Sequence, residues 1–247
     1  MKVVILAAGY GTRMGKLARN IPKPLLSVGG KTILEHLIDK LSVIDEINSY
    51  YIITNQKFIS YFSDWQRDFS ENRDGYLDIE LLNDGTTCNE NRFGAIRDLQ
   101  FAIDAIHINE DLIVAAGDNL FQFDLKDSFS FHKAHECDTI HIIPIEDVQQ
   151  LRRTGVVQID QHHRVIGFEE KPLYPKSHYG CPPLYFFKRD TIQSIGQYLS
   201  EKQNPDAPGN FIGWLYKRRP VYAYLIKGTR FDVGNPETYQ KVRALYS

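Results

Sequence analysis

The chain has 247 residues, of which 43% are hydrophobic and 24% are charged, which is typical of a globular protein that can bury a substantial core. Its formal net charge of −2 argues against a protein that holds nucleic acid through a broad basic surface, although a few well-placed cations could still bind a polyphosphate. No segment has the length of a membrane span or a signal-peptide core, and three cysteines without a CxxC pair indicate a reducing compartment, so we expect a cytoplasmic protein.

Apolar runs rich in β-branched residues alternate with amphipathic helical patterns in the first half of the chain. Thr32 and Glu35 have the spacing of a capping box, which predicts a helix that begins directly after Thr32. Further helical repeats of apolar residues follow Phe58 and Ile96. The predicted strands between the helices are residues 2–8, 50–54, 78–82 and 112–116. This alternation predicts a mostly parallel sheet with helices on both faces.

From about residue 139 the pattern changes, because predicted strands follow one another with fewer helices between them. These strands are residues 139–145, 155–159, 164–169 and 185–188. Residues 204–210 are predicted to form a surface loop, and residues 236–245 a helix with proline in its first turn. We therefore expect a single domain, residues 1–247, with an α/β Rossmann-like fold: a mixed, mainly parallel sheet flanked by helices, with an antiparallel extension.

A glycine-rich turn directly follows the first predicted strand. Its glycines let the backbone bring N–H groups close to phosphate oxygens, and Arg13 can hold a phosphate through two parallel hydrogen bonds. Ligands of open parallel sheets bind at the carboxyl ends of strands, where this turn lies. The turn lacks the lysine of a P-loop, and the spacing between Gly11 and Gly15 does not fit the dinucleotide fingerprint. We therefore predict a polyphosphate site of a different kind.

Lys23 lies between two prolines, shortly after the glycine turn. The prolines restrict the backbone on both sides, so this lysine can serve as a positioned cation for a phosphate. An isolated segment of this kind would more often be an ordinary exposed turn. Its place after the glycine turn favours the phosphate role.

Five segments, in this order, resemble the signature of the sugar-phosphate nucleotidylyltransferases, a family that includes the glucose-1-phosphate thymidylyltransferases. They are residues 6–13, 22–25, 117–119, 168–172 and 231–234. The resemblance implies an enzyme that condenses a nucleoside triphosphate with a sugar 1-phosphate and releases pyrophosphate. It also implies a nucleotide-binding half at about residues 1–138 and a sugar-phosphate-binding half at about residues 139–247. We expect the short form without a C-terminal hexapeptide-repeat domain, and the family likeness is compatible with a homo-oligomer.

The resemblance implies that the reaction depends on Mg²⁺ and on three catalytic residues, which are Arg13, Lys23 and Asp118. Asp118 and Asp232 match the two carboxylates that bind the metal. Mg²⁺ prefers one or two carboxylates, with water and phosphate oxygens completing its coordination, so the implied set fits its chemistry. Because two anions must approach each other, catalysis of this kind consists mostly of positioning and charge neutralisation.

The remaining matches concern the substrates. Glu170 matches a residue that binds sugar hydroxyls, and Lys171 one that binds the sugar phosphate. Gly117, in the segment of residues 117–119, is also implied to contact the sugar phosphate. The residues implied to contact the nucleotide come from the glycine turn and from two later segments, and they are Leu6, Ala8, Gly9, Gly11, Thr12, Arg13, Asn83, Asn91 and Gly94.

Two segments depart from the family pattern: residues 181–183, near the sugar in the family, and residues 89–95, near the nucleoside. These departures leave the identity of the sugar substrate open. They also leave open the base of the nucleotide, which could be thymine, uracil, cytosine or guanine. One alternative is a cytidylyltransferase acting on a phosphomonoester such as phosphocholine, whose choline group would need an aromatic or acidic cage. Another is a non-catalytic regulatory protein that binds a nucleotide sugar. Such proteins typically lose a metal carboxylate or the reactive lysine, and all of these residues are present.

Overall fold

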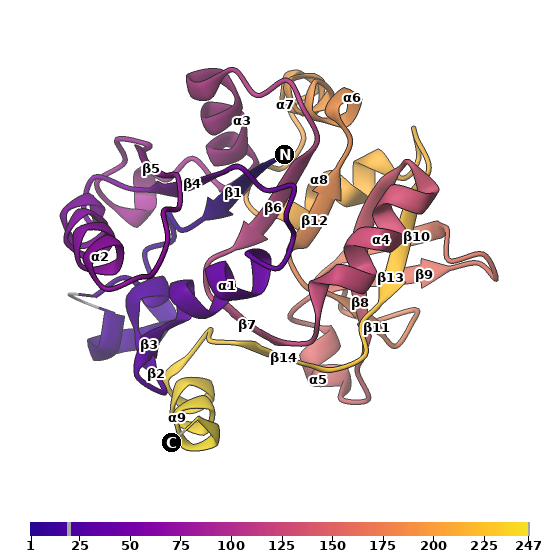
Figure 1. Cartoon of the computed structure of the whole chain (residues 1–247). Helices are drawn as coiled ribbons and strands as arrows, with labels where there is room; N and C mark the ends of the chain where they lie inside the picture. Colours follow the sequence, from indigo (N-terminus) through magenta and orange to yellow (C-terminus); the bar gives the residue numbers. More distant parts are fainter. Residues whose placement is uncertain (19–20, 247) are drawn as a thin grey trace. The chain divides into compact units, whose positions relative to one another are not determined.

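The computed structural model of this chain describes residues 1–18 and 21–246 and contains two compact units (Figure 1). The first unit comprises residues 1–92, 116–125 and 228–247, and the second comprises residues 93–115 and 126–227. Because the chain passes from one unit to the other several times, each unit combines segments that are far apart in the sequence. The division into a nucleotide-binding half and a sugar-phosphate-binding half stays a prediction.

The first unit is built on parallel strands in the order β1 (Lys2–Leu6), β4 (Ser49–Thr54), β5 (Ile79–Asn83). Every residue of β4 is buried, as expected of a strand covered on both faces. The register pairs Leu6 with Ile53 and Thr54 with Asn83, so the three strands end at the same edge. Helix α2 (Ile59–Glu71) packs beside β5 (Figure 1).

Helix α1 (Ile33–Leu41) begins at the predicted residue and follows a hairpin of β2 (Ser27–Val28) and β3 (Lys31–Thr32). The Thr32 hydroxyl accepts the Glu35 N–H at 3.1 Å, and the Glu35 carboxylate accepts the Thr32 N–H at 2.7 Å. The other oxygen of Glu35 accepts the indole N–H of Trp65 at 3.0 Å. One carboxylate therefore caps α1 and ties α2 to it, which confirms the capping box.

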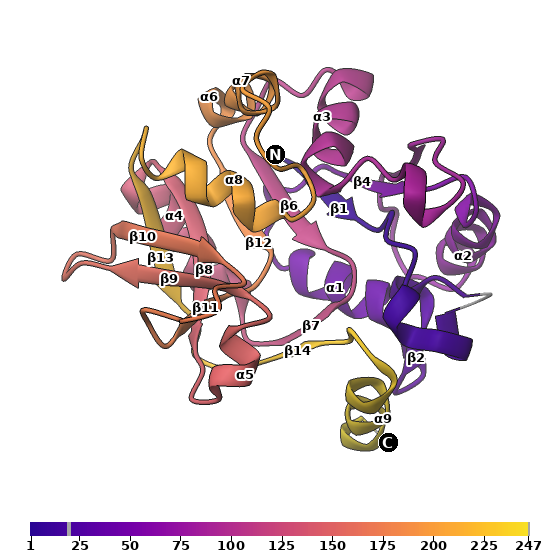
Figure 2. The ribbon, with the colours of Figure 1, turned by 180° about the vertical axis from the view of Figure 1, so that it is seen from behind.

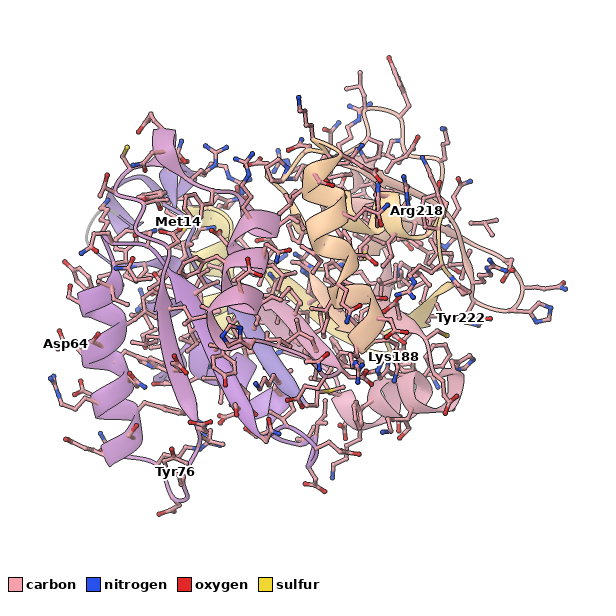
Figure 3. All side chains as sticks on the ribbon, turned by 90° about the horizontal axis from the view of Figure 1, so that it is seen from above. Met14, Asp64, Tyr76, Lys188, Arg218 and Tyr222 are labelled. Atoms are coloured by element: carbon pink, nitrogen blue, oxygen red, sulfur yellow. The ribbon has the colours of Figure 1, made fainter. Side chains whose placement is uncertain are left out.

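The last segment of the chain completes the first unit. Strand β14 (Thr229–Asp232) pairs antiparallel with β7 (Asn119–Gln122), and helix α9 (Pro236–Leu245) follows it. The Asn235 side chain accepts the N–H of Thr238 at 2.9 Å, which caps α9 at the predicted start. Helix α9 packs beside the short helix η1 (Thr12–Ala18), where Met14 is fully buried and points inward, whereas Tyr76 points into solvent (Figure 3).

The second unit contains a mixed sheet in the order β10-β9-β11-β8-β12-β6, with β13 parallel to β8 and the other pairs antiparallel. Its strands are β6 (Leu112–Ala116), β8 (Asp138–Pro144), β9 (Gly155–Ile159), β10 (Val165–Glu170), β11 (Tyr179–Cys181), β12 (Leu184–Phe187) and β13 (Val221–Leu225). Five of these strands, β6, β8, β9, β10 and β12, were predicted to within a residue or two. The expected α/β class, a Rossmann-like mixed sheet flanked by helices, is confirmed.

The helices of the second unit are α3 (Ala95–Ile106), α4 (Leu125–His135), α5 (Val148–Leu151), α6 (Arg189–Ile192), α7 (Ser194–Ser200) and α8 (Pro208–Leu215). Helices α3, α7 and α8 pack on one another, and α8 also lies against β10 (Figure 2). The surface loop predicted for residues 204–210 is too long, because α8 begins at Pro208. Proline fits the first helical turn, and Phe211, Ile212 and Leu215 bury the apolar face of this helix. Within the described residues, no helix combines the length and the apolar character required to cross a membrane.

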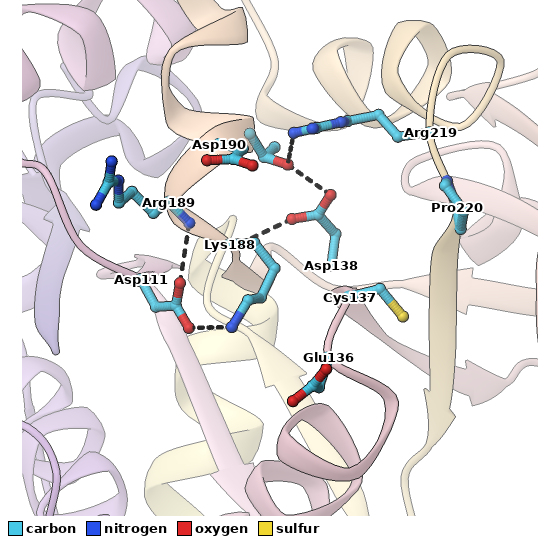
Figure 4. Close-up of a pocket in the computed structure, with 10 residues that line it drawn as sticks. Asp111, Glu136, Cys137, Asp138, Lys188, Arg189, Asp190, Arg219 and Pro220 are labelled. Atoms are coloured by element: carbon cyan, nitrogen blue, oxygen red, sulfur yellow. Dashed lines mark hydrogen bonds and ion pairs between the residues drawn. The ribbon is translucent and has the colours of Figure 1, made fainter.

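A pocket of about 350 Å³ lies in the second unit where β6, β8 and β13 begin (Figure 4). The Asp138 carboxylate accepts the Lys188 N–H at 2.9 Å and the Thr191 hydroxyl at 2.7 Å, and Arg219 donates to the same hydroxyl at 2.8 Å. Asp111 accepts the ammonium of Lys188. Burial raises the pKa of Asp138 to about 6, against the opposing effect of its hydrogen bonds. Side-chain and backbone donors of the protein therefore satisfy the carboxylates of Asp111 and Asp138. The hydrogen bonds connect the starts of β6, β8 and β13 to α6.

His132 of α4 lies fully buried beside this network. Its Nδ1 is 3.2 Å from the Thr139 hydroxyl, whereas its Nε2 has no hydrogen-bond partner among the residues described and lies 4.0 Å from Asp111. Burial and the positive charge of Lys188 lower the pKa of His132 to about 4. The native protein therefore holds this ring neutral at pH values where an unfolded chain would protonate it.

This difference predicts how stability changes with pH. A lowered pKa in the folded state means that the free energy of unfolding falls as the pH drops from about 6.5 to about 4, by about 3 kcal/mol for one such histidine. Asp138, whose pKa is raised to about 6, has the opposite effect: it increases the free energy of unfolding as the pH falls below about 6. In urea unfolding at pH 7 and pH 4, we expect His132→Leu to lose less stability on acidification than the wild type. The exposed control His162→Leu should behave as the wild type, and an unchanged pH dependence in His132→Leu would contradict the assignment.

Candidate active site

The glycine turn leaves the carboxyl end of β1 after Leu6. The Asn55 amide donates to the carbonyl of Ala8 at 2.8 Å and fixes the turn from the side of β4. Gly11 has a φ of 63°, in the left-handed region that favours glycine. A Cβ at position 9 would have no described atom within 4 Å, so the backbone there is open to a ligand. The turn is thus held on one side and accessible on the other.

Thr12 and Arg13 begin η1, and both are exposed. Their exposure is compatible with the predicted contact to phosphate, because neither side chain is used to hold the core. The Arg13 charge is also close enough to Asp232 to favour the ionised form of that carboxyl.

Lys23 begins a short helix, η2 (Lys23–Leu25), and is directed at Asp118. Its ammonium lies 2.8 Å from the Asp118 Oδ2, and its side chain is only 11% exposed. Gly117, next to Asp118, donates its N–H to the Leu6 carbonyl at 3.0 Å. A Cβ at position 117 would lie 3.2 Å from the Pro24 side chain, closer than most Cβ contacts. The end of β1, the lysine turn and the Gly117–Asp118 pair therefore meet at one place in the first unit.

The pairing of β7 with β14 brings the second aspartate to the same place. Asp232 is opposite Asn119 in the register, and the Val233 N–H donates to the Asp118 carbonyl at 3.1 Å. Arg230, two residues before Asp232, has its guanidinium 3.5 Å from the Asp232 Oδ2. We refer to Lys23, Asp118, Asn119, Arg230 and Asp232 as the carboxylate cluster.

The two carboxyl groups of this cluster have pKa values shifted in opposite directions. Burial raises the pKa of Asp118, but the charge and hydrogen bond of Lys23 outweigh it, so the net pKa is below the usual value. The partial loss of hydration around its carboxyl group and the negative charge of Asp118 raise the pKa of Asp232, despite the nearby cations. Each carboxylate therefore opposes the ionisation of the other, as expected of like charges held close together.

The donor set of the cluster fits a magnesium ion. Two aspartates supply the one or two carboxylates that Mg²⁺ prefers, leaving its other positions for water and phosphate oxygens. The Asp232 carboxylate is 46% exposed, so it can accept a further ligand. In the part of the chain that the structure describes, no group of three or more His, Cys, Asp or Glu residues could form an all-protein metal site.

The residues predicted to contact the nucleoside make local bonds. Asn83, at the end of β5, donates to Gln56 at 2.7 Å and accepts the Gly85 N–H at 3.0 Å. Asn91 accepts the N–H groups of Thr87 and Cys88, both at 3.1 Å. These bonds shape the loop after β5, and a role in nucleoside binding stays a prediction.

Gly94 belongs to the second unit, where it precedes α3 with a φ of 86°. A Cβ at this position would lie 2.8 Å from the Pro205 carbonyl, and the N–H of Ile96 donates to the same carbonyl at 3.0 Å. Glycine is therefore required here by the close packing of α3 on the loop before α8.

Glu170 and Lys171 lie at the end of β10 in the second unit. The Lys171 ammonium is 3.5 Å from Glu170, and the lysine side chain is 52% exposed. Lys171 has a φ of 49°, which is uncommon for a residue other than glycine, and its N–H donates to the Thr154 carbonyl at 3.1 Å. Burial raises the pKa of Glu170, although Lys171 opposes the shift. The pair combines a half-buried carboxylate with an accessible ammonium.

Sequence reasoning missed two contributors to these sites. Arg230 precedes Asp232 by two residues, the spacing that puts side chains on the same face of a strand, and this was the available signal. Gly209 of α8 lets the helix approach Glu170, because a methyl group there would collide with the carboxylate. The sequence gave no indication of this contact, because Gly209 fell within the predicted surface loop of residues 204–210.

Comparison with known proteins identifies the class. Residues 2–247 match the Nucleotidyl transferase family, and the chain belongs to this family. It is 29% identical to the glucose-1-phosphate adenylyltransferase of Desulfitobacterium hafniense and 29% identical to the bifunctional protein GlmU of Methanococcus aeolicus, in each case over 96% of this chain. The matches cover 61% and 52% of those proteins, so the chain spans little more than half of their length.

Solved structures share the fold. A Bacillus anthracis protein named as a glucose-1-phosphate thymidylyltransferase, crystallised with sucrose, aligns with a TM-score of 0.84 at 22% identity, over 100% of this chain and 95% of that one. A UDP-glucose pyrophosphorylase in complex with UDP-glucose aligns with a TM-score of 0.82 at 20% identity, over 99% of this chain and 97% of its own. At sequence identities of 22% and 20%, the structural similarity shows a shared fold and no more.

The packing of α8 on Glu170 gives a prediction. We expect Gly209→Ala to lower the free energy of unfolding by about 1–3 kcal/mol, because the methyl group displaces the Glu170 carboxylate and the Phe168 ring. Gly213→Ala, on the same helix, is the matched control, since its methyl group would lie 3.4 Å from Phe168, an ordinary contact. Alanine favours the helix there, so Gly213→Ala should be neutral or stabilising. Equal urea midpoints for the two variants would refute the account.

Proposed function

We propose that the protein is a sugar-1-phosphate nucleotidylyltransferase, which condenses a nucleoside triphosphate with a sugar 1-phosphate. One observation carries the proposal: Lys23, Asp118 and Asp232, distant in sequence, form one charged cluster beside an open glycine turn. Membership of the Nucleotidyl transferase family supports the same reaction type.

In the proposed reaction, a phosphate oxygen of the sugar 1-phosphate attacks the α-phosphorus of the triphosphate. A new P–O bond forms while the bond from the α-phosphorus to the oxygen bridging it to the β-phosphate breaks. Pyrophosphate leaves with that bridging oxygen and its electron pair. No general base is required, because the attacking phosphate is already ionised at neutral pH.

The residues of the first unit act by position and charge. The N–H groups of the glycine turn and Arg13 hold the triphosphate, and the Lys23 ammonium stabilises negative charge at the reacting phosphates. Asp118 and Asp232 would hold Mg²⁺, which when bound would supply charge neutralisation to the triphosphate. Lys23 contacts Asp118 at 2.8 Å, so its role requires that the ammonium exchange this partner for a phosphate oxygen.

In the second unit, Lys171 orients the attacking phosphate and Glu170 accepts hydrogen bonds from sugar hydroxyls. The half-buried Glu170 suits a neutral, hydroxyl-bearing ligand, and the exposed Lys171 suits an anionic one.

A glucose-type sugar is favoured, because the adenylyltransferase, thymidylyltransferase and pyrophosphorylase relatives all carry glucose in their names. Those names differ in the base, so we leave the base open. A homo-oligomer and a cytoplasmic location stay predictions.

The alternatives are separated by one assay. Pyrophosphate release is measured for dTTP, UTP, CTP and GTP, with ATP added because of the adenylyltransferase relative, against several sugar 1-phosphates and phosphocholine. We expect release with a hexose 1-phosphate and Mg²⁺. Release only with CTP and phosphocholine would favour the cytidylyltransferase alternative. If no pair of substrates releases pyrophosphate but the protein binds a nucleotide sugar, the regulatory protein is favoured.

Removing Asp118 tests the metal role. We expect Asp118→Ala to lower the rate of pyrophosphate release by at least about 10²-fold, the scale seen when one preorganised charge-stabilising group is lost. The exposed Asp45→Ala serves as the control, with circular dichroism to verify folding of both variants. Near-normal synthesis by folded Asp118→Ala would rule out the metal role of this carboxylate.

A further inference from the structure

The carboxylate cluster contains a cation that the proposed reaction does not use. Arg230 lies on β14 with its side chain only 11% exposed, and its guanidinium is 3.5 Å from the Asp232 Oδ2. Its Nε also donates to the Asn119 Oδ1 at 2.6 Å. A nearly buried arginine with two specified partners is not a solvated surface charge.

Asn119 extends this contact to the other aspartate. It is 1% exposed, and its amide nitrogen donates to the Asp118 Oδ1 at 2.9 Å. One guanidinium therefore forms an ion pair with Asp232 directly and is connected to Asp118 through one buried amide. Because the amide oxygen and nitrogen are both used, Asn119 has one orientation, and that orientation fixes an oxygen of Asp118.

We propose that Arg230 is a positioning residue that aligns the two metal-binding carboxylates and, by its charge, keeps the affinity of the free enzyme for divalent cations low. This inference rests on the proposed function, since the metal-binding role of Asp118 and Asp232 is part of it. Arg230 itself contacts neither substrate nor metal in this account.

The charges of the cluster support the second part of the inference. Lys23 and Arg230 place two positive charges against the two carboxylates, and the charge of Arg13 also acts on Asp232. A divalent cation arriving alone therefore meets a site without net negative charge. The Lys23 ammonium is on a flexible stem and can move to an arriving triphosphate, whereas the guanidinium of Arg230 is held by Asn119 and stays. The metal is then bound best together with the nucleotide, whose negative charges restore the attraction.

The two roles of Arg230 predict opposite effects of removing it. Arg230→Gln deletes the positive charge, so the free enzyme should bind Mn²⁺ about 10-fold more tightly. It also releases Asn119, so Asp118 is less well aligned, and the turnover number should fall by about 10-fold or more. A residue that only supports the local structure would weaken metal binding and turnover together.

The experiment titrates the free protein with Mn²⁺, measures unbound Mn²⁺ by electron paramagnetic resonance, and measures pyrophosphate release separately. Arg230→Lys keeps the charge but lacks the Nε that bonds Asn119, so its Mn²⁺ affinity should equal that of the wild type while its turnover is reduced. Arg67→Gln, which removes an exposed arginine from α2 of the same unit, should match the wild type in both measurements. Thermal melting of each variant verifies that it is folded.

Tighter Mn²⁺ binding by Arg230→Gln, with wild-type affinity in Arg230→Lys, would support the inference. Unchanged or weaker binding by a folded Arg230→Gln variant would overturn it. Should Arg230→Gln fail to fold, wild-type turnover in Arg230→Lys would overturn the positioning role. Failure of the proposed function is distinguishable, because it would appear as a wild-type protein that releases no pyrophosphate with any substrate pair.

Discussion

Two carboxylates that repel each other lie near one another in the first unit, and the contacts around them hold them in place. Asp118 and Asp232 raise the cost of ionising one another, as the raised pKa of Asp232 indicates. The antiparallel pairing of β7 and β14 fixes their backbones, and Lys23 and Arg230 offset their charge. A site that keeps like charges near one another attracts a cation, which is why this repulsion indicates function rather than stability.

Small residues and buried polar groups make that arrangement possible. Gly117 lets Asp118 lie beside the lysine turn, because a larger residue would meet Pro24. Asn119 is buried at the cost of desolvation, which is offset by its bonds to Arg230 and Asp118. Neither residue contributes much to a hydrophobic core. Their value lies in the geometry that they impose on the neighbouring carboxylate.

Elements with strong local signals could be predicted from the sequence, and those that depend on distant contacts could not. The capping box at Thr32 and the proline at 236 each identify a helix start within a few residues. Strands β7 and β14 have four residues each, and the contact between Asn119 and Arg230 spans 111 positions, so no local pattern predicts their pairing. The glycine turn and Lys23 predicted a phosphate site from the residues themselves, whereas the two aspartates were found only through the resemblance. Arg230 was not found at all, because a sequence does not tell whether an arginine faces carboxylates or water.

The lysine–carboxylate pairs of the two candidate sites illustrate why environment, rather than residue type, decides their chemistry. Lys23 is 11% exposed and lies 2.8 Å from Asp118, whose pKa is lowered, so this pair stays charged and can neutralise a polyphosphate. Lys171 is 52% exposed and lies 3.5 Å from Glu170, whose burial raises its pKa, so the carboxylate is weakly paired and the ammonium remains accessible. The first pair must exchange partners to act, whereas the second already presents its cation. A tightly held lysine therefore suits the reacting centre, and a loosely held one suits the capture of a diffusing phosphate.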